Sequence, residues 1–210
     1  MDYKYIVIEG NIGAGKTSLA RMIAHKHNAD IILEQYADNP FLPKFYKDPG
    51  RYSFSLEMSF LATRYHQLSG DLQKNKAPLA IADYAISKSL VFSRTTLQPD
   101  EFKLYQQLFD IISSQLPTPD LYIYLYLPAD LLLNNIQHRG RDYEVSITKD
   151  YLEHLHQNYV MYLKSRNDMR ILYVDRSNID FIGDPKDYDK LEEIIFNKTY
   201  DYGISKVRIP

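Results

Sequence analysis

The sequence predicts an α/β fold with a five-stranded parallel sheet flanked by helices, and two observations lead to this prediction. Five short apolar runs have the length of strands, and most show no polar alternation, as expected of parallel strands covered on both faces. Longer segments with the apolar spacing of helices separate these runs, so strand and helix alternate along the chain. The expected helices are residues 15–27, 51–75, 100–115, 129–139, 148–166 and 187–198.

Each expected strand is an apolar run, and local signals mark several helix ends. The runs are YIVIEG, DIILEQ, PLAIAD, LYIYLYL and RILYVD, within residues 5–10, 30–35, 78–83, 121–127 and 170–175. Pro99, Asp100 and Glu101 suit a helix start, and QLPTPD ends that helix before the fourth strand. Residues 36–52, which hold several prolines and aromatics, are expected to form a shaped loop.

Length and composition limit the class of protein. The 210 residues are 45% hydrophobic and 25% charged, which suits one globular domain over residues 1–210. The net charge of −2 gives no cationic excess, so neither nucleic acid nor a membrane surface is expected as a partner. The chain has no cysteine, which excludes disulfides and cysteine-ligated zinc. Without a signal peptide or a membrane-length apolar run, the expected location is the cytoplasm.

The segment GNIGAGKT follows the first expected strand and matches the phosphate-binding pattern G-x-x-x-x-G-K-[ST] in full. Such glycines let backbone N–H groups surround phosphate oxygens, and the next helix adds partial positive charge. Lys16 would neutralise the β- and γ-phosphates of ATP, and the Thr17 hydroxyl would ligate Mg²⁺. A glycine-rich turn with an exposed lysine is the simpler alternative. The expected ATP-binding residues here are Gly10, Asn11, Ile12, Gly13, Ala14, Gly15, Lys16, Thr17 and Ser18.

Acidic residues end the second and third expected strands. Because ligands bind beyond the carboxyl ends of parallel strands, Glu34 and Asp83 should face the phosphates. Phosphoryl transfer requires a base for the attacking hydroxyl, a metal anchor and cations. Glu34 suits the base, and Asp83 suits the Mg²⁺ side, through water. The alternative is that both acids are merely solvated.

Two arginines flank the glycine that ends the expected helix 129–139. Arg139 and Arg141 would belong to a short lid that closes over the phosphates and excludes water. Arginines at a helix C-terminus also complement the helix dipole, which is the alternative explanation. With the phosphate-binding motif, these residues favour a P-loop kinase fold that acts on a small molecule.

Several motifs together resemble the deoxynucleoside kinase family over nearly the whole chain, most closely its bacterial deoxyguanosine kinases. They are IEGNIGAGKT, DNPFLPKFY, FSLEMSFLATRYHQ, ADY, RGRDYE and VDRSNIDFIGDPKDY. The resemblance implies transfer of the γ-phosphate of ATP to the 5′-hydroxyl of a deoxynucleoside. It also implies a five-stranded parallel sheet and a homodimer.

The family's functional positions transfer to particular residues. Glu34 would accept the proton of the 5′-hydroxyl, and Arg139 and Arg141 match lid arginines. Tyr46 and Glu144 match the positions that hold the 3′-hydroxyl, and Tyr84, directly after Asp83, is also expected to bind the nucleoside.

One further match to the family lies at residues 180–181, and two departures from its pattern lie at residues 35 and 84. Asp180 and Phe181 match a loop beside the adenine of ATP. Gln35 follows Glu34, where many members have proline. The pair Asp83-Tyr84 stands where many members have Asp-Arg, whose arginine holds the 5′-oxygen, although the bacterial deoxyguanosine kinases also have Asp-Tyr. What replaces that cation is left open by the sequence.

Glu57 and Arg64 lie in the middle of the apolar face of the helix at 51–75. Seven residues place them about 10 Å apart along the helix axis, too far for an easy ion pair. Either each one pairs with a group on a neighbouring helix, or both contact a base. Glu57 accepts only, as the N1–H and N2–H₂ donors of guanine require, and Arg64 donates only, as O6 and N7 require.

This pairing predicts deoxyguanosine as the substrate, with deoxyinosine tolerated and deoxyadenosine disfavoured. Phe54, Phe60 and Phe92 are candidates for stacking on the base. The alternatives are a deoxyadenosine or broad-range kinase, a nucleoside monophosphate kinase, or a nucleotide-binding subunit without activity.

Overall fold

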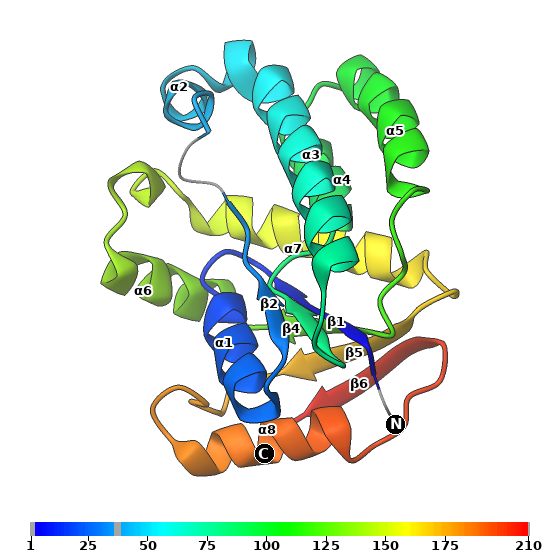
Figure 1. The fold of residues 1–210 in the computed structure, drawn as a ribbon. Helices are drawn as coiled ribbons and strands as arrows, with labels where there is room; N and C mark the ends of the chain where they lie inside the picture. The colour runs from blue at the N-terminus through cyan, green and yellow to red at the C-terminus, as the bar shows by residue number, and fades with distance from the viewer. Residues whose placement is uncertain (1–2, 36–38, 210) are drawn as a thin grey trace.

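The computed structural model describes residues 3–35 and 39–209, so residues 36–38 of the expected loop lie outside the described residues. Its centre is a fully parallel sheet with strand order β2-β3-β1-β4-β5-β6, which confirms the predicted fold class (Figure 1). The strands are β1 (Tyr5–Gly10), β2 (Asp30–Ile32), β3 (Ala80–Ala82), β4 (Leu121–Tyr126), β5 (Arg170–Asp175) and β6 (Gly203–Arg208).

The sheet has six strands rather than the expected five. The additional strand, β6, lies at the edge and pairs in parallel with β5 from Gly203↔Arg170 to Arg208↔Asp175. Its sequence, GISKVR, contains no continuous apolar run because an edge strand is only partly covered. Two polar residues separate its apolar side chains, Ile204 and Val207, so the strand shows neither a continuous apolar run nor a regular alternation.

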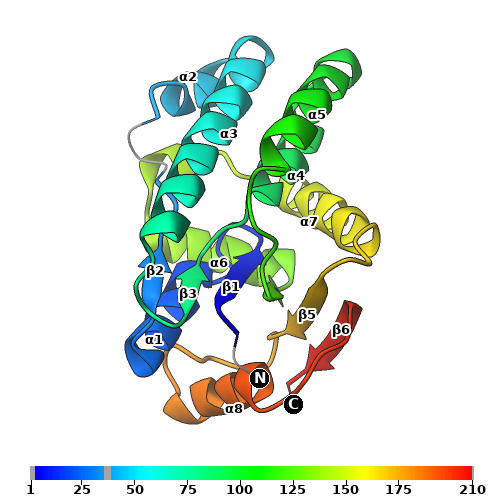
Figure 2. The same cartoon turned by 45° about the vertical axis from the view of Figure 1, so that its right-hand side comes forward.

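The helices form layers on both faces of the sheet. Helices α1, α6 and α8 contribute to the core on one face, and α3, α4 and α7 contribute on the other (Figures 1 and 2). None of the helices in the described ranges combines the length and the apolarity that crossing a membrane requires. The helices are α1 (Lys16–His27), α2 (Leu42–Lys47), α3 (Pro49–Lys74), α4 (Ser87–Thr96), α5 (Pro99–Ser113), α6 (Ala129–Arg139), α7 (Lys149–Lys164) and α8 (Pro185–Phe196).

Two helices occupy segments in which none was expected. Helix α2 and the start of α3 replace much of the loop expected at 36–52. Helix α4, SKSLVFSRTT, follows β3 directly and packs against α3, α5 and α7. Its serines and threonines weaken the apolar periodicity, so tertiary packing rather than local pattern stabilises it. This helix has a direct bearing on the site, because its first turn carries Lys88.

Candidate active site

The phosphate-binding loop connects β1 to α1 and has the strained backbone that only glycine accommodates. Gly13 and Gly15 have φ values of 81° and 86°, in the left-handed region. At Gly10, a Cβ atom would lie 2.6 Å from the carbonyl oxygen of Leu125 on the neighbouring strand. Lys16 Nζ donates to the carbonyls of Gly10 (3.0 Å) and Asn11 (2.9 Å), so its ammonium lies across the loop.

A cavity of about 720 Å³ opens beside this loop, and it is lined by cations. Its walls include Gly13 to Ser18 of the loop, together with Arg139 and Arg141. Arg176, at the end of β5, also lines it and donates from Nε to the carbonyl of Ala14 at 3.0 Å. Arg176 was not among the predicted site residues, although its position directly after a strand, within VDRSNID, is a signal for one. Phosphate groups are the chemistry that such a cavity suits.

Asp180 and Phe181, expected beside the adenine, have different environments. Phe181 is fully buried in the core, and its ring packs against Gly15 and under the guanidinium of Arg176. The ring of Phe181 therefore does not line the cavity, although its neighbours Asp180 and Ile182 in the expected adenine loop do. Asp180 lines the cavity, and its carboxylate accepts from the N–H groups of Ile182 and Gly183.

The carboxyl ends of β2 and β3 bring Glu34 and Asp83 to the loop, as expected. Asp83 accepts from the Thr17 hydroxyl at 2.5 Å and from the backbone N–H of Glu34 at 2.8 Å. No group of three or more histidine, cysteine, aspartate or glutamate side chains within residues 3–35 and 39–209 could hold a metal. Mg²⁺ typically takes one or two protein oxygens and completes its shell with phosphates and water, so Thr17 and Asp83 fit this ion.

Glu34 is held by two cations. Its Oε1 accepts from Arg64 Nε (2.9 Å) and Nη2 (2.7 Å), and its Oε2 accepts from Lys88 Nζ (2.5 Å). Burial alone would raise the pKa of this carboxyl, but Lys88 and Arg64 outweigh burial and lower the pKa of Glu34 to about 2. Glu34 is therefore ionised and fixed in orientation.

Glu57 and Arg64 do not rely on each other for hydrogen bonds. Arg64 also donates from Nη1 to Ser89 at 2.8 Å, and Glu57 Oε1 accepts from the Thr96 hydroxyl at 2.9 Å. Partners on the neighbouring helix α4 thus satisfy part of each group, as the structural alternative required. Glu57 Oε2, however, is buried and has no hydrogen-bond partner within the described residues. Burial raises the pKa of Glu57 to about 7, although Arg64 and Thr96 oppose the shift.

A second, smaller cavity of about 140 Å³ adjoins the first and has an aromatic lining. The two cavities meet at Glu34, because both are lined by Lys16, Thr17, Glu34 and Asp83. Besides these residues, the smaller cavity is lined by side chains from the helices above the sheet. They include Phe45, Tyr46, Glu57, Phe60, Arg64, Lys88, Phe92, Thr96, Glu144 and Tyr151.

Two of the expected nucleoside contacts lie outside this cavity. Tyr84 is fully buried in the core and lines neither cavity, so the structure contradicts its assignment as a binding residue. Phe54 packs in the cluster between α3 and α5, whereas Phe60 and Phe92 line the cavity. Lys88, which lines the cavity from α4, was missed because α4 itself was missed.

A turn follows α6 at the position where the lid was expected. Gly140 ends the helix at φ 67°, and Arg139 and Arg141 flank it as the sequence predicted. Arg139 forms a two-pronged contact with Glu144, and Arg141 Nη1 donates to the same carboxylate at 3.3 Å. Glu144 is buried with only 6% of its surface exposed. The structure therefore pairs Arg139 and Arg141, which were expected to contact the phosphates, with Glu144, which was expected to bind the nucleoside.

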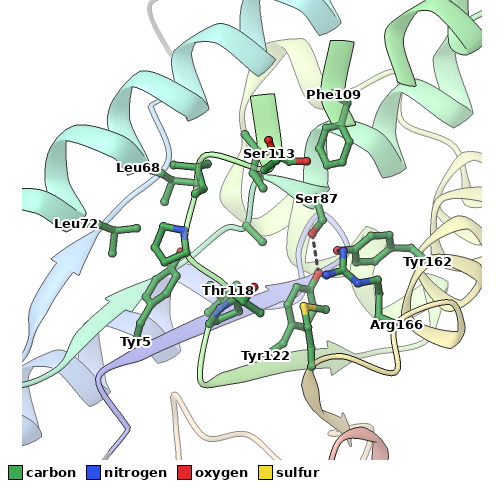
Figure 3. A pocket seen from close by; sticks show the side chains of 18 of the residues that line it. Tyr5, Leu68, Leu72, Ser87, Phe109, Ser113, Thr118, Tyr122, Tyr162 and Arg166 are labelled. Carbon is green, nitrogen blue, oxygen red and sulfur yellow. Dashed lines mark hydrogen bonds between the residues drawn. The ribbon is translucent and has the colours of Figure 1, made fainter. Parts of the chain in front are cut away.

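A third cavity, of about 300 Å³, lies between α3, α5 and α7 and is bounded by the segments that lead into β4 and β5 (Figure 3). Leu68 and Leu72 of α3 line one side, and Tyr162 of α7 and Arg166, just after that helix, line the other. Arg166 donates to Tyr162 and to Asp168. Neither the residues of the phosphate-binding loop nor Glu34 and Asp83 line this cavity, so it is not the active site.

The fold and the site are those of a P-loop phosphotransferase. A parallel sheet carries the phosphate-binding loop, the Thr17–Asp83 pair and the fixed Glu34 at the ends of its strands. The sequence model of the deoxynucleoside kinase family matches residues 6–199, so the chain belongs to the deoxynucleoside kinase family. It is a deoxynucleoside kinase with the fold of that family.

Individual relatives support this assignment. A deoxyguanosine kinase of Bacillus subtilis is 37% identical over 193 residues, covering 89% of this chain and 93% of the relative. A deoxyadenosine kinase of Lactobacillus acidophilus is 30% identical, covering 84% of this chain and 87% of the relative. A solved structure of the deoxyadenosine kinase from M. mycoides superposes with a TM-score of 0.80 at 23% identity, covering 92% of this chain and all of that one.

Proposed function

We propose that this kinase phosphorylates the 5′-hydroxyl of a purine deoxynucleoside, deoxyguanosine above the others, and uses ATP and Mg²⁺. One observation carries the choice of base: Glu57, whose buried Oε2 has no hydrogen-bond partner among the described residues, lines the same small cavity as Arg64. The 37% identity to a relative named deoxyguanosine kinase supports it.

The reaction divides between the two cavities. ATP takes the larger one, with its phosphates in the loop of Gly10 to Ser18, and the deoxynucleoside takes the smaller one. A lone pair of the 5′-oxygen attacks the γ-phosphorus and forms the new O–P bond. The bond from phosphorus to the bridging oxygen breaks, and its electrons leave with ADP. The proton of the 5′-hydroxyl passes to Glu34.

The low pKa of Glu34 is compatible with its role as the base. In a loose transition state the attacking oxygen loses its proton late, so a weak base in a fixed position is sufficient. Arg64 and Lys88 provide that fixation through both carboxylate oxygens. Lys16 and Arg139 neutralise charge on the transferred group. Mg²⁺, held at Thr17 and Asp83, supplies further charge neutralisation when bound.

The base is selected by the direction of its hydrogen bonds. An ionised Glu57 accepts from N1–H and N2–H₂ of guanine, and Arg64 reaches O6 or N7 with the N–H groups not committed to Glu34 and Ser89. Adenine N1 would face an acceptor, which leaves two lone pairs opposed. Deoxyadenosine remains the second candidate, because a Glu57 pKa of about 7 lets the protonated form donate to adenine N1.

The remaining parts of the proposal concern the assembly and its location. The chain acts as one domain over residues 1–210, on small-molecule substrates, in the cytoplasm. The homodimer implied by the family is supported by Leu104 and Ile111 of α5, which are 51% and 66% exposed and seven residues apart on one helix face.

A substrate panel combined with Glu34→Gln tests the proposal. With ATP and Mg²⁺, the unaltered protein should turn over deoxyguanosine fastest, then deoxyinosine, then deoxyadenosine. Glu34→Gln should lower kcat by about 10²–10⁴-fold, since a positioned base contributes about that much, while deoxyguanosine still binds in calorimetry. Glu153→Gln, which changes an exposed carboxyl on α7, is the matched control and should leave kcat unchanged.

Two outcomes would contradict these expectations. Absence of turnover with every deoxynucleoside would remove the proposed activity. Unchanged turnover by Glu34→Gln would remove Glu34 as the base while leaving the activity in place.

A further inference from the structure

The chain lacks a cation directly after Asp83, and the structure supplies one from another position. Tyr84, which stands there, is turned into the core. Lys88 lies four residues later, in the first turn of α4, and reaches the Glu34 carboxylate at 2.5 Å. Its side chain is 8% exposed and lines the cavity that adjoins the phosphate loop.

The turn that carries Lys88 is anchored to the centre of the sheet. The N–H of Ala85 donates to the fully buried carboxylate of Glu9 on β1 at 2.8 Å. Glu9 also accepts from the Tyr159 hydroxyl of α7 at 2.9 Å, and the N–H of Lys88 donates to the Ala85 carbonyl at 3.1 Å. These contacts hold the start of α4 in register with β1 and α7, so the Lys88 side chain starts from a rigid backbone.

The position of Lys88 is unfavourable for folding by itself. A lysine in the first turn of a helix faces the positive end of the helix dipole, and burial of its ammonium is costly. Lys16 from the phosphate loop and Arg64 from α3 add like charge nearby. Glu34 from β2 and Glu9 from β1 offset it. A residue that opposes local preference in this way indicates a functional reason.

We propose that Lys88 is the cation that holds the attacking 5′-oxygen against Glu34, in place of the arginine that many family members carry after the aspartate. Its ammonium has three N–H groups. One donates to Glu34 Oε2, as the structure records, and a second donates to the 5′-oxygen. This inference rests on the proposed function and adds a catalytic residue to it.

The geometry gives Lys88 and Arg64 separate tasks. Arg64 donates two N–H groups to Oε1 of Glu34 and a third to Ser89. In the transfer step Arg64 therefore positions Glu34, the catalytic base. Lys88 binds Oε2 alone, and the ring of Phe92 covers it with Nζ 5.5 Å from the ring centre. A contact of Lys88 with the 5′-oxygen aims the oxygen lone pair at phosphorus while the proton faces Glu34.

Three variants of the full-length protein test this inference. Lys88→Met removes the charge and keeps the length of the side chain, and Lys88→Arg restores a cation. Lys149→Met is the matched control, because Lys149 also begins a helix and pairs with a carboxylate, Asp130 at 2.7 Å, but lies away from the site. Measurements are kcat, KM for deoxyguanosine and ATP, calorimetric binding of deoxyguanosine, and the circular dichroism of each variant.

Lys88→Met should lower kcat at least about 100-fold, the effect expected when a group that aligns reacting atoms is lost. Its affinity for deoxyguanosine and its KM for ATP should change less than about fivefold, because guanine and the triphosphate are bound by residues other than Lys88. Lys88→Arg should recover at least tenfold of the loss, and Lys149→Met should match the unaltered protein.

The outcomes that overturn the inference are distinct from those that overturn the function. A folded Lys88→Met with kcat within threefold of the unaltered protein, or one whose lost kcat is not recovered by Lys88→Arg, overturns the role of Lys88 alone. If Lys88→Met does not fold, Lys88→Gln, which removes the charge and keeps an uncharged donor, is held to the same two criteria. Absence of turnover by the unaltered protein overturns the proposed function and this inference together.

Discussion

Glu57 concentrates the specificity question in a single side chain. It is 2% exposed, one of its oxygens has no partner in the described part of the chain, and burial raises its pKa to about 7. A buried carboxylate without full hydrogen bonding destabilises the fold unless a ligand completes it. The base of the substrate is the ligand that the proposed function provides.

Glu57→Gln should change the choice of base rather than the rate of transfer. An amide both donates and accepts, so the ratio of kcat/KM for deoxyguanosine over deoxyadenosine should fall at least about tenfold. In the unaltered protein the same ratio should fall as pH is lowered from about 8 to 6, because protonation of Glu57 places a donor opposite adenine N1. The ratio of the variant should be independent of pH. A ratio that moves with neither the substitution nor pH contradicts the role of Glu57.

The same substitution has a stability signature with a definite sign. The pKa of Glu57 is about 7 in the folded protein against a usual 4.5, so between these values the folded state binds the extra proton. Stability therefore falls as pH rises through this window, by roughly 3 kcal/mol once Glu57 is ionised. Glu57→Gln should accordingly gain stability over the unaltered protein at pH 8 and much less at pH 5, as measured by urea unfolding.

At the level of elements, the turn after α6 connects the two cavities. Arg139 and Arg141 line both of them and pair with Glu144, which lines the smaller one. A nucleoside hydroxyl that binds Glu144 would compete for the same oxygens and direct the guanidinium groups toward the phosphates. Occupation of one cavity would then prepare the other, as in lids that exclude water during transfer.

Arg139→Ala should therefore reduce kcat more than it reduces nucleoside affinity. We expect about a 10²-fold loss of kcat, typical of a removed cation at a transferring group, and less than about a fivefold change in deoxyguanosine binding. The control Gln137→Ala changes an exposed residue of the same helix that lines neither cavity, and it should leave kcat unchanged. Equal effects of Arg139→Ala on kcat and on binding would argue against action in the transition state.

Over the whole molecule, the parallel sheet determines where chemistry can occur. β1, β2 and β3 end side by side, which brings the phosphate loop, Glu34 and Asp83 together from segments far apart in sequence. β5 contributes Arg176 at the same end. On the far side of β5, β6 closes the edge and carries Val207 and the following Ile209 into the core.

Deletion of residues 203–210 should destabilise the molecule without removing any residue of the site. Loss of the buried Ile209 and the partly buried Val207 should lower the free energy of unfolding by roughly 2–4 kcal/mol, since a fully buried side chain contributes about 1.5–3 kcal/mol. The exposed edge of β5 should also promote aggregation, visible in light scattering. Lys206→Ser, which alters an exposed side chain and keeps the backbone pairing, should unfold at nearly the same urea concentration as the unaltered protein. A deletion variant as stable as Lys206→Ser would show that β6 is dispensable.

Much of this architecture was readable in the sequence where a local pattern determines a structure. GNIGAGKT predicted its own loop because its backbone shape depends on glycine at fixed positions. Continuous apolar runs predicted the buried strands, and Gly140 predicted the end of α6. β6 and α4 were not predicted because their apolar patterns are weak. Since α4 was not predicted, Lys88 was not recognised as a residue of the site.

By itself the sequence determined the fold class, the phosphate loop, the strand-end acids and the family. Only the tertiary structure decided which charges meet: Glu34 with Arg64 and Lys88, Glu57 with Thr96, and Arg139 with Glu144. It also turned Tyr84 and Phe181 into the core. The reason is that backbone patterns are short-ranged and repeat along the chain. The partner of a buried charge is instead selected by packing between elements that the sequence separates by tens of residues.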